Sequence, residues 1–236
     1  MVTPTYDITT EQPTGQPAER PAGLRARKKR RTHDALLRVA LERFTTQGYE
    51  QTTIDEITDA VEVSQRTFFR YFASKEEVAF TAMDMVEGTL IEALRTRPAT
   101  EPPFEAMRHA ITSAWSTVVE TIETVMPVGL YMRTCLMIES TPPLAAVHLR
   151  RSVDLEDGLA RLIADREGLD VNTDPRPRVA VAAFTGVMRL TGRLWGRRQE
   201  ADLESLRELT ELYLDQLTPV LAGEWQRPER EGSGPA

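Results

Sequence analysis

The stretch TIDEITDAVEVSQRTFFRYF, residues 53–72, predicts two short amphipathic helices separated by a tight turn. Thr53 with Glu56 three residues later forms the pattern of a capping box, in which the two residues satisfy each other's backbone N–H groups at a helix start. Ser64 is a second helix-start residue and stands directly before Gln65. The second helix combines four aromatic rings with polar side chains long enough to reach a partner. This mixture is typical of a helix that packs on one side and binds on the other.

We expect the rings and the polar groups of this second helix to face opposite sides. Phe68 and Phe72 are four residues apart and therefore share one helical face. Gln65, Arg66 and Thr67 at the helix start offer donors and acceptors to base edges in a DNA major groove. Arginine suits guanine and glutamine suits adenine in such a groove. The alternative interpretation is an ordinary polar first turn without a binding role.

The flanking sequence extends this pair into a module of three helices. Apolar residues at helical spacing predict a helix over about 32–47, and Gly48 follows where a left-handed cap belongs. Further helices are predicted over about 54–61 and 65–71. Ser74 and Glu77 repeat the capping-box pattern and open a longer helix to about Arg95. Three short helices in this order are the layout of a helix-turn-helix DNA-binding module.

Beyond residue 98 the pattern is helical throughout, with no alternating strand signal. Helices are predicted over 102–124, 127–139, 143–167, 176–199 and 202–222. The expected fold is all-α, with a three-helix DNA-binding domain followed by a larger helical bundle for effector binding and dimerisation. The expected divisions are a disordered tail (1–22), a helix-turn-helix domain with a basic arm (23–75), a ligand-binding and dimerisation domain (76–225) and a second disordered tail (226–236).

The charge distribution supports a nucleic-acid partner for the first domain only. The net charge is −7, yet residues 20–75 hold twelve Lys/Arg against seven Asp/Glu. Six of the nine residues in 23–31 are basic. We expect this run to form a flexible arm along the minor groove that adds salt-sensitive affinity through Arg27, Lys28 and Arg30. A solvated arm without a partner is the alternative.

Composition and motifs argue against several other classes of protein. The one cysteine, Cys135, excludes an internal disulfide and fits a reducing compartment. No apolar run is long enough for a bilayer or a signal peptide, so we expect a cytoplasmic protein without a membrane partner. The three histidines are scattered, and no metal-binding or phosphate-binding motif is present. A helical enzyme is therefore disfavoured, no metal or cofactor is expected, and Cys135 is expected to be an inert thiol.

The segment FTTQGYEQTTIDEITDAVEVSQRTFFRYFASKEEV, residues 44–78, resembles the DNA-binding region of the TetR family of bacterial transcriptional regulators. The resemblance covers about 31–80, and the residues that carry it are Phe44, Gly48, Tyr49, Thr52, Thr53, Ile57, Val63, Ser64, Phe72, Ser74 and Lys75. SQRTFFRYFASKE is also similar to a branch whose effector domain is described as acyl-CoA-like. The resemblance implies a two-fold homodimer, joined through four helices, that binds a palindromic operator on double-stranded DNA.

The resemblance also assigns roles within the first domain. Tyr71 and Lys75 match family positions that contact the DNA backbone, and the helix start at Thr53 can hold a phosphate. Two residues depart from the pattern. Phe69 stands where the family has a phosphate-binding tyrosine, so that contact is not expected. Glu62 stands where the family often has glycine, which costs about 1 kcal/mol if the backbone is left-handed there. The expected DNA-binding residues are Arg27, Lys28, Arg30, Thr53, Ser64, Gln65, Arg66, Thr67, Arg70, Tyr71 and Lys75.

The second domain is expected to hold a cavity for a small apolar or acyl-type effector. The segment 127–138 is apolar nearly all round, as in a helix inside a bundle. Arg133 within it would meet an anionic head group. The alternative is plain core, with Arg133 reaching solvent or an acid. The expected ligand-binding residues are Phe104, Met107, Trp115, Tyr131, Met132, Arg133 and Met137.

The last two helices are expected to build the dimer. Glycines in FTGVMRLTGRLWG allow helices to approach closely, and the final helix carries more leucines than one face needs. The expected interface residues are Phe184, Val187, Met188, Gly192, Trp195, Leu206, Leu209 and Tyr213. The hypothesis is a ligand-responsive regulator, a repressor released from DNA by its effector. The alternative is a DNA-binding regulator without a small-molecule sensor, controlled by abundance or by a protein partner.

Overall fold

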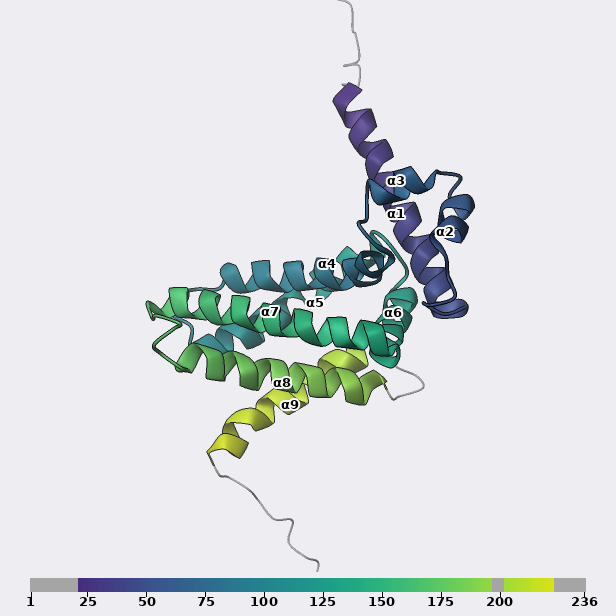
Figure 1. Cartoon of the computed structure of the whole chain (residues 1–236). Coiled ribbons are helices and arrows are strands. Elements are labelled where there is room, and N and C mark those ends of the chain that lie inside the picture. The colour runs from purple at the N-terminus through teal and green to yellow at the C-terminus, as the bar shows by residue number, and fades with distance from the viewer. Residues whose placement is uncertain (1–20, 197–201, 223–236) are drawn as a thin grey trace, which may run out of the picture.

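The computed structural model describes residues 21–196 and 202–222, and every regular element in these ranges is an α-helix (Figure 1). The all-α fold predicted from the sequence is therefore confirmed. The helices are α1 (Pro21–Thr46), α2 (Ile54–Ala60), α3 (Gln65–Phe69), α4 (Lys75–Arg95), α5 (Pro103–Glu123), α6 (Val128–Ser140), α7 (Pro142–Glu167), α8 (Arg176–Gly196) and α9 (Leu203–Leu221).

The start of α1 differs from the prediction, because the basic run is helical and not a flexible arm. Leu, Ala, Arg and Lys are strong helix formers, and no proline interrupts the chain between Pro21 and Pro98. The helix therefore continues through the basic run toward Pro21. Most of the predicted N-terminal tail, residues 1–20, and the predicted C-terminal tail, 226–236, lie outside the described residues.

The turn between α2 and α3 is built as its capping residues predict. The Thr53 hydroxyl accepts the Glu56 N–H at 3.2 Å, and the Thr53 N–H donates to the Glu56 carboxylate at 2.8 Å. The Ser64 hydroxyl accepts the Thr67 N–H at 3.2 Å. Glu62 lies between these caps in the left-handed region, with φ of 56°. The strain predicted for a non-glycine residue in this turn is therefore present.

Ser74 caps α4, although the second half of its predicted capping box differs. Its hydroxyl accepts the Glu77 N–H at 3.0 Å, but the Glu77 carboxylate accepts the N–H of Ala73, one residue before the cap. Gly48 follows the end of α1 and has a positive φ of 104°, as expected for a glycine after a helix end.

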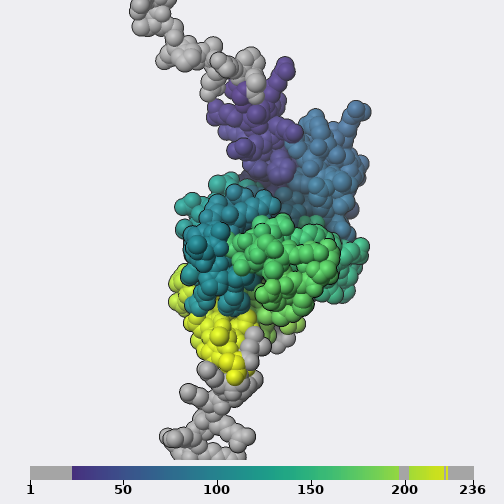
Figure 2. Space-filling view, turned by 90° about the vertical axis from the view of Figure 1, so that its left-hand side faces the viewer, coloured from purple at the N-terminus to yellow at the C-terminus, as the bar shows by residue number. Residues whose placement is uncertain are grey.

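Two hydrophobic cores share α4, and this helix therefore connects the two domains. The first core joins inner residues of α1 and α3 to the start of α4, to the end of α5 and to α6; it includes Leu37, Phe68, Phe72, Phe80 and Ile122. The second core lies between α4, α5, α7, α8 and α9, and includes Leu94, Met107 and Phe184. In Figures 1 and 2, α1–α3 lie at one end of the molecule and α9 lies toward the other. None of the described helices is both long enough and apolar enough to span a bilayer.

Candidate DNA-binding surface and internal cavity

Helix α3 separates its rings from its polar groups as the sequence predicts. Phe68 and Phe72 are 0% and 2% exposed, with ring centroids 5.6 Å apart. Phe69 points away from this core and is 51% exposed. On the outer side, a shallow hollow is lined by Ser64, Arg66, Thr67, Phe69 and Arg70. The polar first turn and the hollow together form a surface that a DNA groove can cover.

The three residues expected to read bases differ in how freely they can do so. Arg66 is exposed, and no residue in 21–196 or 202–222 pairs with its guanidinium. The Gln65 amide donates a hydrogen bond to Asp55 and so links α3 to α2. The Thr67 hydroxyl lies 3.1 Å from the Ser64 hydroxyl. Arg66 is thus the readiest base-contacting group, and the base contacts of the other two stay predictions.

Tyr71 and Arg70 lie where α3 meets α1. The Tyr71 ring contacts the His33 ring edge-on at 6.1 Å, and the Arg70 guanidinium lies 5.1 Å above the Tyr71 ring. His33 in turn stacks on Phe72 at 4.8 Å. The basic part of α1 ends at Arg31, within one turn of His33. A DNA backbone that contacts Tyr71 would therefore run close to this basic part.

The basic part of α1 projects beyond α3 as a helical extension (Figure 1). Arg27, Lys28 and Arg30 are exposed on it. At 1.5 Å per residue, residues 21–31 extend for roughly 15 Å. The phosphate contacts predicted for these cations stay predictions, but a helix presents the charges at fixed positions along its axis.

The helix start at Thr53 is less favourable for a phosphate than expected. Its hydroxyl and its N–H both bond Glu56, which lowers the pKa of that carboxyl. Asp55 adds a second negative charge to the same turn. The carboxylates already occupy the positive end of the helix dipole. A phosphate contact at Thr53 stays a prediction.

The DNA backbone contact expected of Lys75 stays a prediction, and its ammonium group also bonds inside the domain. It donates to the carbonyl oxygens of Tyr49 at 2.6 Å, Thr52 at 2.9 Å and Glu50 at 3.5 Å. It also lies 4.3 Å from the centroid of the Tyr49 ring. An ammonium group has three donors, and these acceptors account for all of them. Lys75 therefore holds the turn between α1 and α2 against the start of α4.

A cavity of about 320 Å³ lies in the second domain between α4, α5, α7 and α8, with Tyr131 of α6 at its edge. Its volume falls at the lower end of the range for small-molecule sites. The apolar wall consists mainly of leucine, isoleucine, methionine and Phe184. The lining residues are Met83, Glu87, Leu90, Ile91, Leu94, Met107, Ala110, Ile111, Tyr131, His148, Ser152, Leu155, Glu156, Leu159, Phe184, Thr185, Met188 and Arg189.

Only Met107 and Tyr131 of the predicted ligand-binding residues line this cavity. Arg133 is exposed and so cannot hold an anionic head group there, and the partly buried Met132 also lies outside the lining. Trp115 and Met137 are partly buried against the first core. Phe104 packs edge-on against Phe184, behind the wall, with centroids 5.8 Å apart. Helical periodicity identifies apolar faces but not which of them surrounds a space, so the ligand contacts of these five residues stay predictions.

Apart from Tyr131, the polar groups of the cavity were not among the residues predicted to bind a ligand. Glu156 of α7 accepts hydrogen bonds from the Thr185 hydroxyl at 2.9 Å and from Arg189. Burial raises the pKa of Glu87 and lowers the pKa of His148. These residues lie in amphipathic stretches with the ordinary charge pattern of surface helices. The sequence therefore carries no signal that separates them from solvent-facing charges.

Burial also raises the pKa of Tyr131 and brings the pKa of Cys135 to about 12. A thiol with this pKa holds little thiolate at neutral pH, as expected for an inert cysteine.

The predicted dimer residues divide between the interior and the surface. Phe184 and Met188 line the cavity, and Leu209 is buried. Trp195 is buried too, and its indole N–H donates to the Asp202 carbonyl at 2.8 Å and to Ser205 at 3.0 Å. These four residues pack within the protomer, and their dimer contacts stay predictions. Val187, Gly192, Leu206 and Tyr213 are partly exposed, and their dimer contacts stay predictions.

Comparisons with known proteins match two family models to separate parts of the chain. Residues 36–82 match the family model of bacterial regulatory proteins of the tetR family, and residues 101–222 match the model of the MftR C-terminal domain. The chain is 45% identical over 219 residues to the HTH-type transcriptional regulator TcmR of Streptomyces glaucescens, covering 93% of this chain and 97% of that protein. A solved transcriptional regulator of Aquifex aeolicus shares the fold, with a TM-score of 0.51 at 15% identity over 80% of this chain and 99% of the other.

Proposed function

The chain belongs to the TetR family of bacterial transcriptional regulators, and on this premise we propose that it is a homodimeric repressor that leaves a palindromic operator when a small molecule fills its cavity. The observation that carries the proposal is the position of α4. This helix lines the cavity through Met83 and Leu90 and begins in the core that holds the DNA-binding helices. A ligand between α4 and α7 thus acts on an element shared by both domains.

Contacts between α4 and α7 support a route from the cavity to the DNA-binding domain. His148 of α7 lines the cavity and stacks on Phe80 of α4, with ring centroids 6.2 Å apart. Arg151 lies 4.9 Å from the same ring and pairs with Asp84. Phe80 is 1% exposed in the core shared with α1 and α3. A ligand that displaces His148 would therefore change the packing around Phe80.

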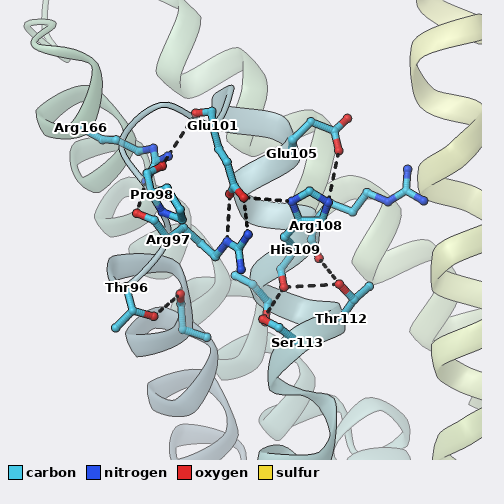
Figure 3. Close-up of polar contacts among 12 residues, drawn as sticks. Thr96, Arg97, Pro98, Glu101, Glu105, Arg108, His109, Thr112, Ser113 and Arg166 are labelled. Carbon is cyan, nitrogen blue, oxygen red and sulfur yellow. Dashed lines mark hydrogen bonds and ion pairs between the residues drawn. The ribbon is translucent and has the colours of Figure 1, made fainter.

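The C-terminal end of α4 is held in place by contacts with α7 (Figure 3). These contacts support a movement in which α4 rotates about this end. Arg166 of α7 donates to the carbonyl oxygens of Arg97 at 3.0 Å and Glu101 at 3.1 Å, and also to that of Pro98. Arg97 and Glu101 pair with each other across the same turn. With this end fixed, movement of α4 at the cavity displaces mainly its other end, where α3 is attached.

A dimer follows from the size of the DNA-reading surface. One recognition helix presents only a few side chains to base edges, so specific binding requires two modules on two half-sites. Apolar side chains left exposed on the last two helices provide a contact area, and they are Val179, Leu190, Leu212 and Val220. Arginine at position 66 of each copy would then read one half-site.

Footprinting on the promoter of its own gene tests the operator part of the proposal. The expected pattern is protection of two symmetric half-sites with centres whole DNA turns apart, lost in Arg66→Ala and kept in Arg95→Ala. Arg95 is exposed on α4 and pairs only weakly with Glu92, at 3.8 Å. Protection of a single half-site, or equal loss in both variants, would contradict the proposal.

A further inference from the structure

Glu87 is a carboxyl group without a partner at the wall of the cavity. It comes from α4 and is partly buried. Within residues 21–196 and 202–222, no hydrogen bond or ion pair reaches its carboxylate. A buried polar group that stays unpaired costs free energy, and a charged one costs more. Tyr131, His148 and Arg189 also line the cavity, but none of these described residues bonds Glu87, and an occupant of the cavity can supply the partner.

The other charges of the cavity do not offset Glu87. Arg189 is the cation of the lining, and it is already paired with Glu156, which also accepts the Thr185 hydroxyl. His148 is held toward its neutral form by burial. The excess charge facing the cavity is therefore negative. An anionic ligand would meet repulsion from Glu87 without a free cation to balance it.

We propose that the effector carries no negative charge and presents a hydrogen-bond donor, an ammonium or a hydroxyl group, to Glu87 while its apolar body lies against the leucine and methionine wall. This inference rests on the proposed function, in which the cavity holds the effector. It replaces the acyl-type effector with an anionic head group that the sequence suggested, because Arg133, the residue expected to bind that head group, lies outside the cavity.

The position of Glu87 on α4 gives this contact a regulatory consequence. Glu87 lies one turn beyond Met83 and two turns beyond Phe80 on the same helix. A donor that bonds Glu87 pulls on α4 directly, whereas a purely apolar occupant acts only through packing. The donor thus contributes both affinity and the difference in affinity between the two states that a switch requires.

Titration calorimetry of the full chain with three matched probes tests the inference. Decylamine, decanol and decanoate each contain ten carbons in an unbranched chain and differ chiefly in the head group. We expect decylamine to bind tightest and decanoate to bind at least roughly tenfold more weakly. Glu87→Leu should abolish this preference, while Glu87→Gln should spare decanol and weaken decylamine because it removes the negative charge. Glu92→Gln, an exposed acid on the same helix, is the matched control and should keep the wild-type order.

Three outcomes would overturn the inference: tightest binding of decanoate, a preference unchanged in Glu87→Leu, or no binding of any probe to the wild-type protein. The proposed function is tested separately by the operator footprint of the same preparations. If none of the probes that bind the protein weakens the operator footprint, the result would contradict the proposed ligand switch, even if probe binding depends on Glu87. A probe order independent of Glu87, together with a loosened footprint, would contradict only the role of Glu87.

Discussion

Replacing Lys75 with methionine removes three donors while keeping the length of the side chain. Hydrogen bonds that involve a charged group contribute about 1.5–3 kcal/mol each. Two of the three hydrogen bonds of Lys75 are shorter than 3 Å. The ammonium group is only partly buried, however, and the carbonyl oxygens that it leaves can bind water. We therefore expect a loss of about 2 kcal/mol, below the sum of the separate bonds. For a chain of this size, that lowers Tm by roughly 4–8 °C.

The assay pairs thermal unfolding with the salt dependence of operator binding, measured well below Tm. Each phosphate contact contributes about 0.9 to the slope of log K against log salt, so a dimer that loses one contact per copy changes by about 1.8. Lys75→Met should destabilise the protein and leave the slope unchanged. Lys28→Gln, on the exposed extension of α1, is the control and should reduce the slope without changing Tm. A reduced slope with unchanged Tm in Lys75→Met would refute the internal role of Lys75.

Three further predictions follow from single side chains. Arg66→Ala should weaken operator binding by about 1–3 kcal/mol, and by less on mixed-sequence DNA, in a competition gel shift; equal losses on both would assign Arg66 to the phosphate backbone. Glu62→Gly should raise the free energy of unfolding by about 1 kcal/mol in urea, since glycine relieves the positive φ; a loss would mean that the Glu62 side chain stabilises the turn. Glu87→Gln should raise Tm at about pH 8, and the gain should shrink toward about pH 4. Burial raises the pKa of Glu87, so its ionisation at higher pH destabilises the folded state; an equal gain at both pH values would contradict this cause. The other titratable groups that line the cavity are unchanged in this variant: Tyr131, His148, Glu156 and Arg189.

Local chemistry made the DNA-binding module predictable in detail. A capping box needs only Thr53 and Glu56 at the right spacing, and both of its bonds form. The positive φ at Glu62 follows from the short turn between two helix caps, and the inward packing of Phe68 and Phe72 follows from helical periodicity. These features depend on residues within one or two turns of each other.

Features that depend on distant parts of the chain were not predictable in the same way. Lys75 bonds carbonyls more than twenty residues earlier, and backbone acceptors leave no mark in a sequence. Helix α8 is apolar on more than one face, so the pattern could not tell that Phe184 lines a cavity. The helical start of α1 is a different case, because its helix-forming composition was visible and was outweighed by the expectation of a flexible arm.

We expect one equilibrium to govern the cavity and the operator, and reciprocal binding measures it. The affinity of decylamine is determined for the free protein and for the protein on its operator, and the affinity for the operator is determined with and without saturating decylamine. We predict that both affinities fall by the same factor, roughly 5-fold to 150-fold, because linkage makes the coupling mutual. Equal affinity of decylamine for the free and the operator-bound protein would contradict the account.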